Sequence, residues 1–304
     1  MDLLLSIVAQ VLRISVPYAL VAVGGCFSER SGVINIALEG ILLNSAFGTA
    51  VGTIASGSAE VGVLCGLLAG ALTAVVHSLV TVVGRADQIV SGLAINIASL
   101  GATRALLKAF YTSASNSPRI LEDALAPLPG FGILGTLGDV VGQPLFLFTV
   151  LVVIAADRFL LRSGRGLLLR AAGERPAALD ASGFSVARVR AVGVILGGAI
   201  AGLGGCWLAF QQNSFTHGMS GGRGYIALAA MIAGKWRPSW AVAACLLFAA
   251  AETLQIRLSG RGVPTQFLQM VPYLVALAVL AGWVGRAIPP AAIGKPYRRG
   301  GEEA

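Results

Sequence analysis

Long apolar stretches, separated by short polar or glycine-rich breaks, dominate the pattern of this chain. A helix that crosses a bilayer needs about 20 consecutive apolar residues, and most of these stretches approach that length. Run length and breakers predict nine helical spans, at 3–26, 33–54, 61–83, 89–109, 144–161, 191–211, 225–234, 240–256 and 267–283. The seventh is too short to cross comfortably, which favours a re-entrant or broken helix surrounded by protein. We expect an all-α polytopic bundle of about nine spans (eight to ten), with residues 1–304 forming a single domain.

The composition supports a membrane protein. Charged residues make up 12% of the chain and hydrophobic residues 56%, whereas a soluble domain carries about 25% charged residues. The alternative, a large soluble α protein, would have to bury several uncharged runs of nearly membrane-spanning length. The four cysteines are scattered singly without a Cys-x-x-Cys pair, so we expect buried thiols and no metal site.

The net charge of +8 does not point to nucleic acid. The basic residues gather in loops between spans and in the tail, and no aromatic residues alternate with them in a basic patch. Basic residues favour the cytoplasmic side of a membrane. This bias predicts a cytoplasmic loop at 162–190, a cytoplasmic C-terminal tail at 286–304 and an external loop at 111–143.

Polar side chains within the spans are mostly neutral. Glu39 and Glu252 are the acidic exceptions, and Arg13 falls in the first span. Charged groups at membrane depth are costly and usually face the bundle interior or an aqueous path; Glu252 is interpreted as structural. If the segment from Gly32 onward is helical, Asn35 and Glu39 lie on one face. The amide-rich interior favours a neutral, hydrogen-bonding solute, although amides also join helix to helix. The predicted substrate pathway comprises Asn35, Glu39, Asn96, Ser91 and Gln211.

Small residues recur every four positions in two of the spans. Such rows let membrane helices pack closely, and a glycine-lined permeation path is the alternative. The predicted packing residues are Gly62, Gly66, Gly70, Gly197 and Gly202. Residues 31–38 also resemble residues 221–228 at five positions, four of which are identical, and this likeness is either chance or the trace of an inverted repeat.

The chain lacks the sequence motifs of several enzyme classes. It has no phosphate-binding Gly-x-x-x-x-Gly-Lys-Ser/Thr loop and no His-Glu-x-x-His. We therefore expect a transport protein that is not itself an enzyme, has no cofactor and has no ATP site of its own.

Four stretches resemble one known family. Residues 29–40, ERSGVINIALEG, are similar to the N-terminal signature of nucleoside-type permease subunits of bacterial ABC importers, within the broad branched-chain amino acid/simple-sugar permease family. Residues 87–96, residues 218–236 and the tail at 290–298 resemble the same subunits, in the expected order and over nearly the whole chain.

This resemblance implies a permease in the bacterial cytoplasmic (inner) membrane that imports nucleosides. It also implies three partners: a separate ABC ATP-binding subunit, a second permease subunit that forms a heterodimer, and an external substrate-binding lipoprotein. A short cytoplasmic helix would dock on the ATPase, and the matching residues are Glu174, Ala177, Ala178 and Gly183, although Arg175 and Pro176 interrupt the usual compact pattern. Arg261, Gly262 and the loop at 111–143 are candidates to meet the lipoprotein.

Two other functions stay open at this point. A permease for ribose or another simple sugar would share most of these motifs. A cation-coupled secondary carrier would stop when the ion gradient is dissipated, and a permease driven by an ATPase would stop when ATP is depleted.

Overall fold

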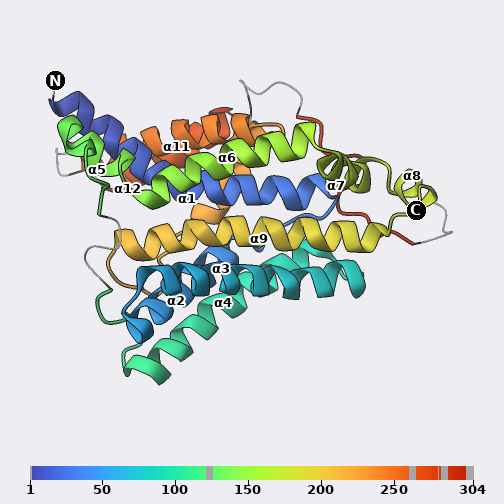
Figure 1. The fold of residues 1–304 in the computed structure, drawn as a ribbon, viewed down its shortest axis with the longest axis horizontal. Coiled ribbons are helices and arrows are strands. Elements are labelled where there is room, and N and C mark those ends of the chain that lie inside the picture. The colour runs from blue at the N-terminus through green and yellow to red at the C-terminus, as the bar shows by residue number, and fades with distance from the viewer. Residues whose placement is uncertain (1, 121–125, 260–264, 280, 282–286, 299–304) are drawn as a thin grey trace.

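A computed structural model describes residues 2–120, 126–259, 265–279, 281 and 287–298. These residues form a bundle of helices and include no β-strand (Figure 1). The helices are α1 (Asp2–Arg30), α2 (Leu38–Ser56), α3 (Ala59–Ser78), the π-helical η1 (Leu79–Val83), α4 (Gln88–Tyr111), the 3-10 helix η2 (Phe131–Leu137), α5 (Gly138–Val141), α6 (Pro144–Arg162), α7 (Gly164–Glu174), α8 (Pro176–Ala181), α9 (Val186–Gln211), α10 (Arg223–Ala233), α11 (Pro238–Leu258) and α12 (Thr265–Ala278).

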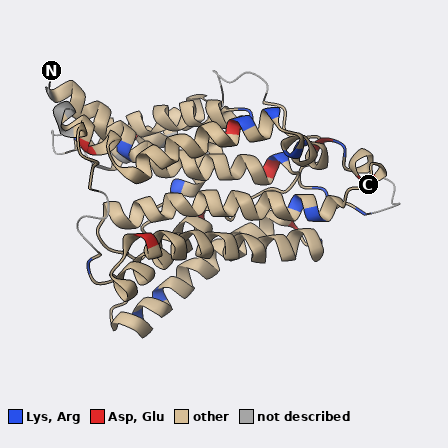
Figure 2. Ribbon diagram, in the orientation of Figure 1, with Lys and Arg blue, Asp and Glu red and all other residues tan. Residues whose placement is uncertain are grey.

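The predicted all-α membrane bundle is confirmed. Each predicted span coincides with a helix, and seven helices within the described ranges are long and apolar enough to cross a membrane. The seventh predicted span is α10, whose 11 residues cover only about 16 Å. The described part of the ninth is α12, with 14 residues. In Figure 2, charged residues are sparse along the long helices, and several of them gather at the end that holds α7 and α8.

The predicted boundary between the first two spans is wrong. α1 continues past residue 26 to Arg30, and residues 33–37 are not α-helical. Asn35 and Glu39 therefore do not share a helical face. α1 continues because Glu29 is paired inside the protein, accepting a hydrogen bond from Trp236 Nε1 at 2.6 Å. It ends at Arg30, and the turn that follows includes Gly32, whose φ of +95° favours glycine.

Side chains from other helices stabilise the break at residues 31–37. The carbonyl oxygen of Ile34 lies 3.0 Å from His77 Nε2, and the backbone amide of Ile34 donates to Gln88 Oε1 at 2.7 Å. The carbonyl oxygen of Ile36 accepts from Asn96 Nδ2 at 2.9 Å. Unsatisfied backbone groups at membrane depth cost several kcal/mol each, so these side chains are what allow the chain to leave the helix here.

Helix α9 is central to the packing. It contacts α1, α2 and α3, and Figure 1 shows it running between α1 and α3. All five glycines predicted to pack helices lie at close contacts: a Cβ atom would clash with a neighbour at four of them and would lie 3.0 Å from Ser45 Oγ at Gly202. A Cβ on Gly70 would lie 2.7 Å from the Gly198 carbonyl oxygen, and one on Gly197 would clash with the Gly24 carbonyl oxygen. The five glycines at these helix contacts are Gly62, Gly66, Gly70, Gly197 and Gly202.

The loop predicted at 111–143 is ordered in its first part by the segment that follows α9. Ser117 N donates to the Phe215 carbonyl at 2.9 Å, and Ile120 N donates to the Asn213 carbonyl at 2.8 Å. Residues 121–125 of this loop lie outside the described residues, as do Arg261 and Gly262, the other candidates for lipoprotein contact.

The described part of the tail, residues 287–298, packs against α7, α8 and α9. Arg190 Nη1 donates to the Lys295 carbonyl at 2.7 Å, and Ala292 N donates to the Gly173 carbonyl at 2.8 Å. Gly294 N donates to the carbonyl of Gly32 at 3.2 Å. The tail therefore joins α7 and α9 to the break after α1.

The contact between α1 and α9 gives a first prediction. Replacing Gly197 by Leu should lower the free energy of unfolding by at least about 1–3 kcal/mol, because its side chain would collide with the backbone of α1. Thermal unfolding and the yield of monodisperse protein in detergent measure the effect. Gly101→Leu is the matched control, since nothing lies within 4 Å of a Cβ at that position. Equal melting temperatures for the two variants would contradict the proposed packing role.

Candidate functional site

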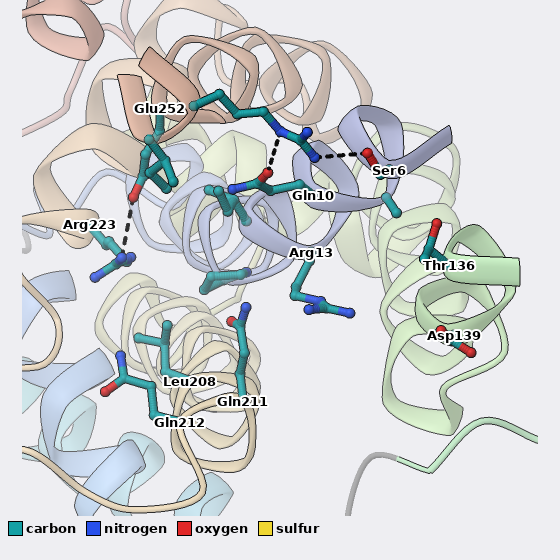
Figure 3. A pocket seen from close by; sticks show the side chains of 15 residues that line it. Ser6, Gln10, Arg13, Thr136, Asp139, Leu208, Gln211, Gln212, Arg223 and Glu252 are labelled. Atoms are coloured by element: carbon teal, nitrogen blue, oxygen red, sulfur yellow. Dashed lines mark hydrogen bonds and ion pairs between the residues drawn. The ribbon is translucent and has the colours of Figure 1, made fainter. Parts of the chain in front are cut away.

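A polar cavity of about 480 Å³ lies at the end of the bundle that holds the N-terminus of α1. Its walls come from α1, η2, α5, the end of α9, the start of α10 and the last two turns of α11. The lining residues include Ser6, Gln10, Arg13, Thr136, Asp139, Leu208, Gln211, Gln212, Arg223, Glu252 and Arg257 (Figure 3). This volume is within the range of roughly 300–1,000 Å³ that is typical of small-molecule sites.

Ionic contacts fix one wall of the cavity. Arg223 Nη2 lies 3.3 Å from Glu252 Oε1, and the Tyr18 hydroxyl donates to Glu252 Oε2 at 2.5 Å. Arg257 donates to Gln10 Oε1 at 3.0 Å and to the Ser6 hydroxyl at 2.9 Å. α10 and α11 are thus joined to each other by Arg223, and α1 is joined to α11 by Tyr18 and Arg257.

Other polar side chains in the cavity have free hydrogen-bonding capacity. Across the described ranges, the side chains of Arg13, Gln211 and Gln212 have no hydrogen-bond or ion-pair partner within the protein. Figure 3 shows Arg13 between Gln211 and the segment that carries Thr136 and Asp139. Arg offers only donors, whereas each Gln offers donors and an acceptor. The cavity therefore combines a fixed ionic wall with groups that are free to bind a polar solute.

Of the five predicted pathway residues, only Gln211 lines this cavity. The other four surround the break between α1 and α2. Asn96 accepts from Gly40 N at 2.8 Å and donates to the Tyr225 hydroxyl at 3.0 Å. Ser91 lies 3.0 Å from His77 Nδ1. Their contacts hold α2, α3, α4 and α10 together.

Asn35 and Glu39 belong to this second group but have different surroundings. Asn35 is fully buried and donates to the Ser28 hydroxyl at 3.0 Å, while its Oδ1 has no partner among the described residues. Glu39 accepts from Gly222 N at 2.8 Å and from Gly224 N at 2.6 Å. Glu39 therefore caps the N-terminus of α10.

The predicted coupling residues lie at the opposite end of the molecule, around α7 and α8 (Figure 1). The Glu174 side chain is 47% exposed; it accepts from Ala291 N at 3.2 Å and lies 3.9 Å from Arg30 Nη1. Ala177, Ala178 and Gly183 are exposed, and Gly183 has a φ of +85°. These residues form a surface open to a partner.

The interpretation of the sequence missed most of the charged lining of the cavity. Arg223 and Arg257 lie outside the predicted spans, and Glu252 is interpreted from the sequence as structural. Arg13 carried a usable signal, because an arginine inside an apolar span marks a polar site by default. A metal site has no support in the described part of the chain, where no three His, Cys, Asp or Glu side chains gather.

Comparisons with known proteins agree on one family. Residues 7–280 match the model of the family described as branched-chain amino acid transport system / permease component. The chain is 36% identical to the guanosine ABC transporter permease protein NupQ of Bacillus subtilis, with 97% of both chains covered. It is also 36% identical to the nucleoside ABC transporter permease protein NupC of Lactococcus lactis, with 96% of both covered.

A third relative has a different printed substrate. The chain is 31% identical to the putative glucose ABC transporter permease protein TsgC13 of Haloferax volcanii, with 86% of both chains covered. The family match covers most of the chain. The helical bundle, apolar spans and motif order of the chain are those expected of a permease subunit. The chain is a multi-pass membrane protein and belongs to the family of branched-chain amino acid transport system permease components.

Proposed function

We propose that this chain is the permease subunit of an ABC importer for nucleosides in the bacterial cytoplasmic membrane. The observation that carries the proposal is the separation of two features. A solute-sized polar cavity lies at one end of the bundle, and an exposed short helix, α8, lies at the other. The two most similar relatives reported above, which are named for guanosine and nucleoside transport, support the choice of substrate.

The polar cavity would receive solute from outside. A nucleoside is neutral and has several hydrogen-bond donors and acceptors, which suits the unpaired side chains of Arg13, Gln211 and Gln212. An external lipoprotein would deliver the solute to this end.

The surface around α8 would dock on a separate ATP-binding subunit in the cytoplasm. Ala177 and Ala178 expose the face of the helix, and Gly183 ends the turn that follows it. A second permease subunit would complete the assembly, which would be a heterodimer in the membrane. Under this arrangement the tail at 287–298 faces the cytoplasm together with α7 and α8.

The substrate assignment predicts a competition order. In proteoliposomes that contain the complete complex, uptake of labelled guanosine should depend on ATP, and unlabelled nucleosides should inhibit it much more strongly than glucose or ribose. Inhibition by sugars alone would identify a sugar permease. Uptake by this chain without an ATPase would contradict the proposal as a whole.

The cavity predicts a loss of affinity on removal of one side chain. Gln211→Ala should raise the KM for nucleoside by roughly fivefold, the equivalent of one neutral hydrogen bond worth about 1 kcal/mol. The maximal rate should change less. Initial uptake rates at varied solute concentration measure both values. Gln266→Ala, at an exposed position on α12 outside the cavity, should leave the KM unchanged.

The α8 surface predicts uncoupling by added bulk. Ala178→Trp should leave membrane insertion intact and lower both ATPase binding and uptake, because the exposed face of α8 would no longer fit its partner. Co-purification of the ATPase and uptake assays measure the two effects. Ala86→Trp, at an exposed position between η1 and α4, is the control. Normal co-purification and uptake by Ala178→Trp would remove α8 from the docking surface.

A further inference from the structure

Helix α10 occupies an unusual position between the two functional ends. It is too short to cross a membrane, and its buried face, which includes Ile226, Ala230 and Met231, packs within the bundle. α1, α2 and α11 all contact it. Its first residue, Arg223, lines the polar cavity. The turn after its last residue reaches the end of α1, beside α7.

The cavity end of α10 is held by two acidic side chains. The Glu39 carboxylate accepts hydrogen bonds from Gly222 N and Gly224 N, which have no partner inside the helix. A carboxylate at a helix N-terminus also opposes the positive end of the helix dipole. Arg223 is paired with Glu252 on α11. A shift of this end of α10 would therefore move the guanidinium that forms part of the cavity wall.

The other end of α10 is held by the last turn of α1. Lys235 and Trp236 both have a φ of +55°, which is uncommon for residues other than glycine and costs free energy. Arg30 stabilises this turn by donating to the Trp236 carbonyl at 2.9 Å and to the Lys235 carbonyl at 3.2 Å. The Trp236 indole donates in turn to Glu29.

Arg30 also connects this turn to the coupling surface. Its Nη1 atom lies 3.9 Å from Glu174 Oε1, at the last residue of α7, and α8 begins two residues later. Continuous polar contacts thus run from Glu174 through Arg30 to the turn at Trp236. From there the three turns of α10 lead to Arg223 and Glu252 at the cavity.

We infer that α10 is the element that transmits movement between the α7–α8 surface and the polar cavity, and that Arg30 is its positioning residue. This inference rests on the proposed function. An ATPase that displaces α7 would pull on Arg30 through Glu174. A regular helix is stiff along its axis, so displacement of the turn at Trp236 would shift Arg223 and alter access to the cavity.

The test follows access to the cavity without using a solute. Gln211→Cys is introduced into a Cys65→Ala background, where the remaining thiols of Cys26, Cys206 and Cys245 are fully buried. The rate of labelling by a membrane-impermeant maleimide is measured on the complete complex in vesicles. Rates without nucleotide and with a non-hydrolysable ATP analogue should differ severalfold.

Arg30→Gln should make these two labelling rates equal while the complex still assembles and hydrolyses ATP. Arg237→Gln is the matched control, because Arg237 follows in the same turn but its side chain is exposed and lacks a described partner. Its nucleotide-dependent difference in labelling should persist. If Arg30→Gln reduces assembly, Glu174→Gln replaces it, since this change removes the charge that pairs with Arg30 and keeps the size of the side chain.

The inference is overturned if an assembled Arg30→Gln or Glu174→Gln complex keeps the nucleotide-dependent difference in labelling rate. It is also overturned if the complex that carries only Gln211→Cys and Cys65→Ala shows no nucleotide-dependent difference in labelling rate while nucleoside uptake is normal. In both cases the proposed function survives, because ATP-dependent uptake of nucleoside is measured separately.

Discussion

The requirement that every backbone polar group at membrane depth has a partner shapes this bundle. Two segments leave regular helix inside it, residues 31–37 after α1 and residues 212–222 after α9. In the first, side chains of His77, Gln88 and Asn96 bind the exposed peptide groups. In the second, the carboxylate of Glu39 receives the free amides at the start of α10. Glu39 and Asn96, two of the predicted pathway residues, thus bind backbone groups of the bundle.

This constraint explains why the acidic residues differ in role. Glu39 is occupied by two backbone amides, and Glu29 is occupied by an indole. Glu252 also has partners, Tyr18 and Arg223, but it lines the cavity. The close glycine contacts around α9 complete the arrangement, since they bring helices near enough for such short side chains to reach across.

The sequence was sufficient to predict the long apolar helices and the gap between the predicted spans 191–211 and 225–234, because apolar run length and helix breakers are local signals. It placed the start of the second span five residues too early, since the break at 31–37 depends on side chains contributed by α3 and α4. The partner of Glu39 is 183 residues away in sequence. The cavity was missed for the same reason, because Arg13, Gln211 and Glu252 converge only when α1, α9 and α11 are packed. Their individual polarity was visible, but their proximity was not.

The contacts of the tail, residues 287–298, with α7, α8 and α9 can form only late in biosynthesis. Arg190 at the start of α9 binds the carbonyl oxygen of Lys295, which is 105 residues later in the chain. At a translation rate of about 5–20 residues per second, the tail is synthesised on the order of ten seconds after α7 and α8, and only then can it pack against them. A truncated or stalled chain would form most of its helices and still lack the tail contacts at the end of the bundle that holds α7 and α8. Completion of this end of the bundle thus depends on completion of synthesis.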